Sequence, residues 1–164
     1  MTQRRYTVDE VDAVVPELAR RFETVMQLRT QLKSLYTRLD DGGHPPGQTL
    51  PEGVDAQTVR DRAVFDGMAE TLRDEVSAIG ASGCVIRDVE IGLVDWLGVA
   101  ADGREVWLCW RYGEPALGYF HELDTGFSGR RPIAELARAG VRGGAGAAGP
   151  PPARGAPDPE ETDS

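Results

Sequence analysis

The residues best suited to chemistry gather near residue 120 of the sequence. His121, Glu122 and Asp124 are potential metal ligands within one short segment. Successive side chains of a strand point to opposite faces, so Glu122 and Asp124 can meet on one face while His121 points to the other. Joined by Asp95 or Asp88, these carboxylates would suit a hard divalent cation such as Mg²⁺ or Ca²⁺.

A second kind of site is suggested by the segment from Gly126 to Arg131, which reads GFSGRR. Its backbone amides and the guanidinium group of Arg130 could hold a phosphate or a carboxylate. Arg111 lies in the preceding strand region and could add a further positive charge. The segment therefore predicts an anion site as an alternative to the metal site.

Zinc is the third possibility, with Cys84, Cys109 and His121 as ligands. A tight turn at Gly113-Glu114 would pair Val106 with His121 across the two flanking strands. In that register Cys109 and His121 lie on opposite faces and cannot share a metal ion. A slip of one residue would reverse this conclusion, because it moves every side chain of a strand to the other face.

The same residues also have structural interpretations. Arg111 and Glu122 would form an ion pair on the open face of the sheet, while His121 would be a hydrogen-bonded core histidine. Asp124 caps a turn, as Asp commonly does. The sequence contains no nucleophile elbow, P-loop, dinucleotide-binding glycine pattern or HExxH zinc motif.

The elements that carry these residues follow from hydrophobic periodicity. Thr7 and Glu10 form a capping box, which marks the start of a helix. Apolar residues then recur at alternating steps of three and four, as on one face of a helix. Pro16 predicts a kink, or a short helix over 8–14 followed by a long helix over 16–39. The apolar ladder is Val8, Val11, Val15, Leu18, Phe22, Val25, Leu32, Tyr36 and Leu39.

A second helix is predicted over residues 54–80, after a loop over 40–53 rich in Gly and Pro. Its ladder has the same spacing, and two helices of similar length with facing stripes form an antiparallel, coiled-coil-like hairpin. The ladder consists of Arg62, Phe65, Ala69, Leu72, Val76 and Ile79.

After Gly83 the sequence becomes rich in β-branched and aromatic residues, which predicts strands. The fold class is therefore α+β, with a long helical hairpin followed by a small antiparallel sheet of about four strands. The domain spans 1–136, and 137–164 form a disordered Ala/Gly/Pro-rich tail that cannot bury enough apolar surface to fold. The predicted strands are 84–88, 92–97, 105–112 and 116–123.

Composition narrows the range of partners. The net charge is −9 and the pI about 4.7, which disfavours nucleic acid and anionic membranes. No apolar run is long enough to span a membrane, and no signal peptide is visible. Two cysteines in apolar surroundings are typical of reduced, buried thiols, so we expect a cytoplasmic protein.

Several segments of the chain resemble one family. They are YTVDEVDAVVPEL at the start, GCVIRDVEIGLVDW, VWLCWRYGEP, and FHELDTGFSGRRPI. Over residues 5–133 the sequence is similar to the bacterial family catalogued as domain of unknown function 2203. The resemblance implies a helical hairpin with an appended sheet and transfers no catalytic role.

Two classes of function fit these observations. The first is a non-enzymatic interaction or structural protein whose hairpin pairs with a second copy or with a helical protein partner. Trp107 and Phe120, on the less buried sheet face, would add an apolar patch. The alternative is a small-ligand- or metal-binding enzyme with its site at Glu122, Asp124 and Arg130. No cofactor is predicted apart from the divalent metal of that alternative.

Overall fold

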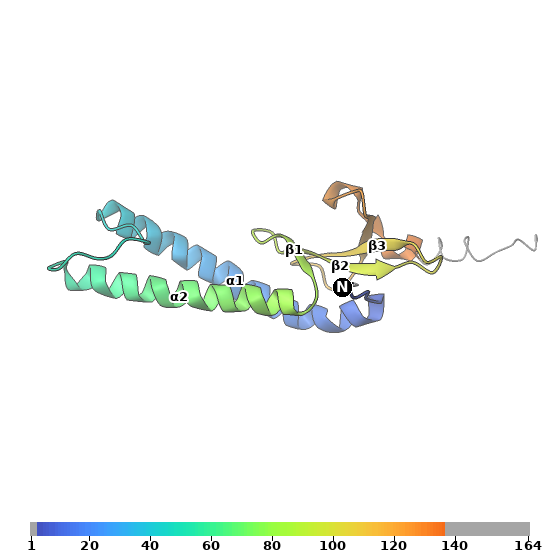
Figure 1. Ribbon diagram of the computed structural model, residues 1–164, viewed down its shortest axis with the longest axis horizontal. Helices are drawn as coiled ribbons and strands as arrows, with labels where there is room; N and C mark the ends of the chain where they lie inside the picture. Colours follow the sequence, from blue (N-terminus) through green and yellow to red (C-terminus); the bar gives the residue numbers. More distant parts are fainter. Residues whose placement is uncertain (1–2, 137–164) are drawn as a thin grey trace, which may run out of the picture.

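The computed structural model describes residues 3–136 and has two long helices followed by a sheet (Figure 1). The predicted α+β class is confirmed, and the predicted tail over 137–164 lies outside the described residues. Neither α1 nor α2 carries an apolar run long enough to cross a membrane. The elements are α1 (Val8–Asp41), α2 (Ala56–Ala81), β1 (Val85–Asp88), β2 (Leu93–Val99), β3 (Glu105–Arg111), β4 (Tyr119–Glu122), the 3-10 turn η1 (Phe127–Gly129) and β5 (Arg131–Pro132).

Helix α1 begins at the predicted capping residue, where the backbone N–H of Glu10 donates to Thr7 Oγ1 at 3.1 Å. The expected division into two helices at Pro16 is wrong, because α1 continues unbroken through it. A proline inside a helix costs about 3 kcal/mol. Burial of Val15 and Leu18 offsets that cost, since each such side chain contributes about 1.5–3 kcal/mol.

The core lies between the first half of α1 and one face of the sheet. Alternation along the strands directs every second side chain of β2, β3 and β4 toward the helix. The two tryptophans and the phenylalanine on this face are fully buried. The core includes Val11, Leu18 and Phe22 of α1, with Val94, Trp96, Leu108, Trp110 and Phe120 of the sheet.

The second half of α1 and the first half of α2 form an arm (residues 30–70) that extends beyond the sheet (Figure 1). Its fully buried residues are Leu35, Leu39 and Asp61. Arg38 donates two hydrogen bonds to the Asp61 carboxylate, at 3.0 and 2.6 Å, and Gln57 donates a third at 2.9 Å. The hydrogen bonds from the Arg38 guanidinium lower the pKa of Asp61. An ion pair therefore sets the register of the two helices in the arm.

The sheet is an antiparallel meander in the order β1-β2-β3-β4-β5. The expectation of about four strands missed the short strand β5, which pairs with Tyr119 and Phe120 of β4. Its sequence, Arg131-Pro132, gave no strand signal, because proline lacks the backbone donor of a sheet and is restricted to edges.

The register of β3 and β4 differs by one residue from the prediction. His121 lies opposite Trp107 rather than Val106, and Cys109 lies opposite Tyr119. Because side chains alternate across a strand, this shift exchanges the two faces of β4 relative to β3. His121 and Cys109 consequently lie on the same face.

The connection between these strands explains the difference. Residues 112–118 form a wide loop instead of a tight turn. The Trp110 indole N–H donates to the Glu114 carbonyl at 3.0 Å, and the Glu114 carboxylate accepts from the Arg111 backbone N–H at 3.0 Å. As a result, Phe120, expected on the less buried face, is fully buried against α1.

We predict that Asp61→Asn lowers the midpoint temperature of thermal unfolding at pH 7, because Arg38 loses its charged partner. Arg38 lowers the folded-state pKa of Asp61 below its ordinary value of 3.8. The pair therefore stabilises the fold above that value, and the stabilisation is lost as the pH falls through the lowered pKa. Thermal unfolding at several pH values should show the gap between wild type and variant closing in acid.

Asp66→Asn is the matched control, because Asp66 belongs to the same helix and pairs with Arg62 at the surface. Exposed pairs of this kind contribute little to stability. If the two substitutions lower the unfolding midpoint equally, the Arg38–Asp61 pair does not hold the arm. The same conclusion would follow if the difference in midpoint between wild type and Asp61→Asn persisted in strong acid.

Candidate functional site

The face of the sheet turned away from α1, called here the outer face, carries an unusual set of polar side chains. Asp95 of β2 lies opposite Cys109 of β3, and His121 of β4 lies opposite Trp107 of β3. Alternation within each strand directs all of these side chains to the same side. Arg87 of the neighbouring strand β1 reaches the same place.

Asp95, Cys109 and His121 form a buried polar cluster together with Arg87. The exposed fractions of Asp95, Cys109 and His121 are 1%, 1% and 3%. Asp95 Oδ2 lies 3.0 Å from His121 Nε2 and accepts a hydrogen bond from Arg87 Nε at 2.8 Å. The ligand atoms of Asp95, Cys109 and His121 all lie within 4.8 Å of one another. Asp95 Oδ1 is buried and has no hydrogen-bond partner among the described residues.

The hydrogen bonds of His121 constrain its protonation. Its Nδ1 lies 2.9 Å from the Glu122 carbonyl oxygen, which can only accept, so Nδ1 must carry the proton. Nε2 lies 3.0 Å from Asp95 Oδ2. A neutral imidazole and a carboxylate would both be acceptors there, so this contact requires either a proton, on the ring or on the carboxyl group, or a metal ion.

The thiol of Cys109 is protonated and unreactive when no cation is bound. Burial, followed by the nearby Asp95 carboxylate, raises the pKa of Cys109 to about 12. A thiol is a nucleophile only as the thiolate. A bound metal ion would reverse this situation, because coordination deprotonates a thiol outright.

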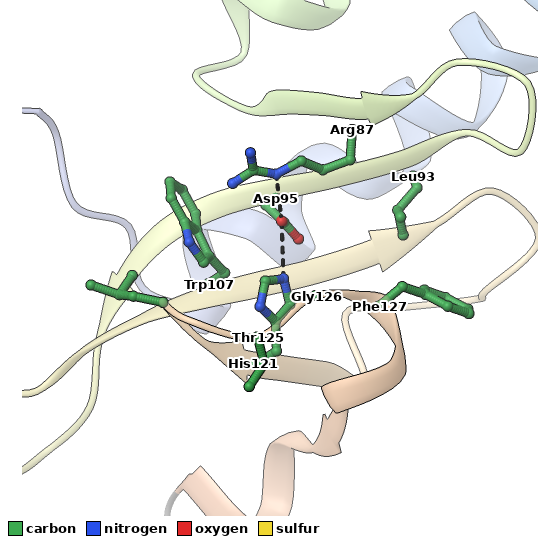
Figure 2. Close-up of a pocket in the computed structure, with 9 residues that line it drawn as sticks. Arg87, Leu93, Asp95, Trp107, His121, Thr125, Gly126 and Phe127 are labelled. Atoms are coloured by element: carbon green, nitrogen blue, oxygen red, sulfur yellow. Dashed lines mark hydrogen bonds and ion pairs between the residues drawn. The ribbon is translucent and has the colours of Figure 1, made fainter.

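A pocket adjoins the cluster on the side of Asp95 and His121, and Cys109 does not line it (Figure 2). Its volume is about 270 Å³. The polar floor consists of Arg87, Asp95 and His121, and Trp107 and Phe127 lie on opposite sides of it in Figure 2. The remaining lining residues are Leu93, Leu123, Thr125 and Gly126.

The segment over 123–130 covers part of the outer face and is fixed at its end by Arg130. That guanidinium pairs with Glu114 at 2.7 Å and stacks on the Tyr119 ring with its central carbon 4.1 Å from the centroid. At Gly129 a Cβ atom would lie 2.6 Å from Thr125 Cβ, so only glycine permits this close packing. The loop wall of the pocket is thus a fixed structure.

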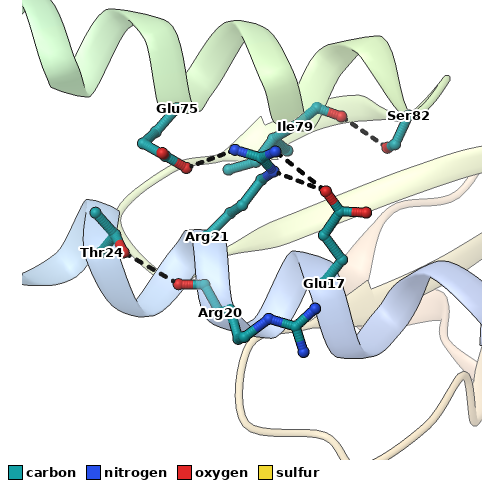
Figure 3. Close-up of polar contacts among 7 residues, drawn as sticks. All are labelled: Glu17, Arg20, Arg21, Thr24, Glu75, Ile79 and Ser82. Atoms are coloured by element: carbon teal, nitrogen blue, oxygen red, sulfur yellow. Dashed lines mark hydrogen bonds and ion pairs between the residues drawn. The ribbon is translucent and has the colours of Figure 1, made fainter.

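A second group of polar side chains, between the two helices, shows the contrast (Figure 3). Arg21 donates to Glu75 at 3.0 Å and to Glu17 at 3.1 Å. The three side chains Glu17, Arg21 and Glu75 pair with one another, and all three remain partly exposed. Pairs of this kind contribute about 1 kcal/mol or less, so this group orients the helices and carries no ligand site.

The acidic residues predicted as a metal site are not brought together. Glu122 lies opposite Val106, and its carboxylate is 3.4 Å from Arg104 and 3.5 Å from Arg131. Asp124 is exposed in the following turn and does not approach Asp95. The predicted ion pair between Arg111 and Glu122 is wrong, because Glu122 lies opposite Val106 and its ionic partners are Arg104 and Arg131.

The predicted anion segment has its charges occupied. Arg130 is paired with Glu114, and Arg131 Nε donates to Glu135 at 2.7 Å. The segment acts instead as the loop that borders the pocket.

The zinc hypothesis named two of the three clustered ligands. Cys109 and His121 meet because the register is shifted, whereas the Cys84 thiol donates to the Ile79 carbonyl at 3.2 Å and belongs to the core on the helix side. The third ligand is Asp95, which the sequence prediction included only as a supplementary carboxylate. A carboxylate inside the apolar strand LVDWLGV was the available signal, since buried charges are paired or bind metals.

The cluster does not have the geometry of a nucleophilic triad. In such a triad the histidine contacts the nucleophile with one nitrogen and the carboxylate with the other. Here Asp95 occupies the Nε2 side and a backbone carbonyl occupies the Nδ1 side. Sulfur, imidazole and carboxylate donors are instead those of zinc sites with three protein ligands, which leave a fourth position open for water or a ligand.

A family model described as "Uncharacterized conserved protein (DUF2203)" matches residues 4–133 of the chain. The match covers the helical hairpin, the sheet and all residues of the polar cluster. No curated protein and no solved structure matches the chain.

We predict that both thiols of the native protein are inert at pH 7. Cys84 and Cys109 are buried, and burial raises the pKa of each. Labelling with a disulfide-exchange reagent in the absence of added metal should proceed only as fast as the protein unfolds, whereas denatured protein should yield both thiols at once. A fast-reacting thiol in native Cys84→Ser would show that Cys109 is an activated cysteine.

Proposed function

Because the chain belongs to the uncharacterized conserved protein family DUF2203, we propose its function from the geometry of the outer face: it is a metal-binding protein whose ion is held by Asp95, Cys109 and His121. The single observation that carries this proposal is the arrangement around Asp95. One carboxylate oxygen lies 3.0 Å from a histidine nitrogen, and the other is buried with no hydrogen-bond partner among the described residues.

A zinc-like transition metal suits these donors. Thiolate, imidazole and carboxylate bind Zn²⁺ at about 2.0–2.3 Å, whereas Mg²⁺ and Ca²⁺ prefer oxygen ligands. The three ligand atoms lie within 4.8 Å of one another, so a small contraction would bring them to one ion. The hydrogen bond from His121 Nδ1 to the Glu122 carbonyl is the usual support of a metal-bound histidine.

The competing interpretation is an imidazolium at His121 paired with Asp95. This would place two positive groups, His121 and Arg87, on one carboxylate in a buried setting. In that case Cys109 would remain a protonated thiol beside Asp95, whose carboxylate helps to raise the pKa of Cys109. A metal ion uses the histidine nitrogen, the carboxylate and the thiol together, which is why we favour it.

We predict that the full-length protein binds one Zn²⁺ or Co²⁺ per chain, with a proton released from Cys109, whose pKa lies at about 12 without metal. The Co²⁺ form should show thiolate-to-metal charge-transfer absorption. Cys109→Ser, Asp95→Asn and His121→Gln should each weaken binding by at least about 100-fold, since outer-shell partners alone contribute 10- to 100-fold.

Cys84→Ser is the matched control, because Cys84 is the other buried thiol and lies on the helix side of the sheet. It should retain wild-type metal affinity and the charge-transfer band. Circular dichroism checks that each ligand variant is folded. If folded wild-type protein takes up neither Zn²⁺ nor Co²⁺, the cluster is a structural ion pair and the proposal is wrong.

A second function, self-association through the arm, is favoured by the incomplete burial of its side chains. Leu32, Phe65 and Met68 of the arm are only partly buried, and Tyr36 and Val64 are each 47% exposed. Two helices alone cannot enclose a core, whereas two hairpins can form a four-helix bundle. We propose a second copy of this chain as the partner.

The charges of the arm are compatible with such pairing. The chain as a whole carries a net charge of −9, which would repel a second copy. Residues 30–41 and 56–70, however, contain four basic and five acidic residues in total, so two arms would meet with little net repulsion.

We predict a concentration-dependent dimer in sedimentation equilibrium, abolished by the double substitution Tyr36→Glu and Val64→Glu. Both side chains are about half exposed, so the monomer should stay folded. Val99→Glu is the control, because Val99 is similarly exposed, at 41%, but lies on the sheet. A wild-type protein that is monomeric at high concentration would exclude this second function.

A further inference from the structure

We infer that the pocket on the outer face binds a small organic anion. This anion would carry a carboxylate or phosphate group on an apolar part about the size of one ring. Arg87 and the open metal position would hold the anionic group. This inference rests on the metal site proposed above and specifies what that site binds.

The charge at the floor of the pocket favours an anion. The two positive charges of a zinc ion would be cancelled by the carboxylate of Asp95 and the thiolate of Cys109. The charge of Arg87 would then remain, because its ionic partner among the described residues is the same Asp95. A fourth ligand carrying one negative charge would neutralise the site.

Arg87 has the geometry to receive this anion. Its Nε donates to Asp95, while its two terminal nitrogens have no hydrogen-bond partner among the described residues. The guanidinium lies over the Trp107 ring, with its central carbon 4.7 Å from the centroid, which fixes its plane. A guanidinium group held in this way can donate two parallel hydrogen bonds to a carboxylate or a phosphate.

The size and walls of the pocket define the body of the ligand. A cavity of about 150 Å³ accepts a benzene molecule, so about 270 Å³ accommodates one ring together with an anionic group. Trp107 and Phe127 flank the polar floor (Figure 2), and Leu93 and Leu123 complete an apolar wall. These side chains would remove an apolar body from water and contact a ring with their aromatic faces.

The acidic surface of the protein argues for a small ligand. With a net charge of −9, the whole chain repels polyanions. A compact anion that enters the pocket instead experiences the local positive charge of Arg87 and the ion. The site therefore selects a small molecule over a nucleic acid or an anionic membrane.

The test uses the full-length Co²⁺-loaded protein, with benzoate, phenyl phosphate, inorganic phosphate and benzyl alcohol as probes. We expect benzoate or phenyl phosphate to bind and to change the visible spectrum of Co²⁺, as entry into the open position requires. Whichever of the two binds more tightly identifies the anionic group. Benzyl alcohol should bind at least about tenfold more weakly, because it lacks the charge.

Arg87→Gln, with its metal content verified, should lose at least about tenfold in affinity for the better anionic probe. Arg104→Gln is the control, because it removes an equal charge from a surface arginine that contacts Glu122 outside the pocket. Its affinity for the probe should match that of the wild type.

Several results would overturn the inference. Equal binding of benzoate and benzyl alcohol would exclude an anion requirement, and unchanged affinity in Arg87→Gln would exclude the role of Arg87. Inorganic phosphate binding as tightly as phenyl phosphate would exclude the apolar body. If Co²⁺ binds and no probe does, the ligand class alone is wrong; if no metal binds, the proposed function fails as well.

Discussion

The pairing of β3 with β4 in one particular register is the constraint on which the rest of the structure depends. With His121 opposite Trp107, Phe120 points under α1 and closes the core, while His121 points to the outer face and meets Asp95. A slip of one residue would exchange these two side chains. It would bury an imidazole in an apolar core and expose a phenylalanine, so the core and the polar cluster specify the same register.

The helical hairpin and the positions of the strands could be predicted from periodicity, because both depend on local sequence. Register could not, since it depends on the loop over 112–118, where hydrogen bonds from Trp110 and Arg111 to Glu114 replace the tight turn predicted at Gly113-Glu114. The cluster was only partly predictable for the same reason. Cys109 and His121 were recognised as potential ligands, but their meeting, and the part of Asp95, required the register.

A buried cluster of this kind is costly unless its groups are satisfied. A buried polar group without a partner costs roughly 1–3 kcal/mol, and more when it is charged. Arg87 donates a hydrogen bond to one oxygen of Asp95, and the other oxygen has no partner among the described residues. A protein that retains such an arrangement in the middle of its sheet gives up stability there, which is typical of binding and catalytic sites.

The arrangement of layers explains why the site lies where it does. The first half of α1 covers one face of the sheet, and the second half of the same helix leaves the sheet to form the arm with α2 (Figure 1). Within residues 3–136, therefore, neither long helix covers the outer face, and the loop fixed by Arg130 covers it only in part. A fully apolar outer face would have been a liability for aggregation. A buried polar cluster beside a small pocket is compatible with one-sided helix packing, and its side chains are held on strands, which are rigid elements of the fold.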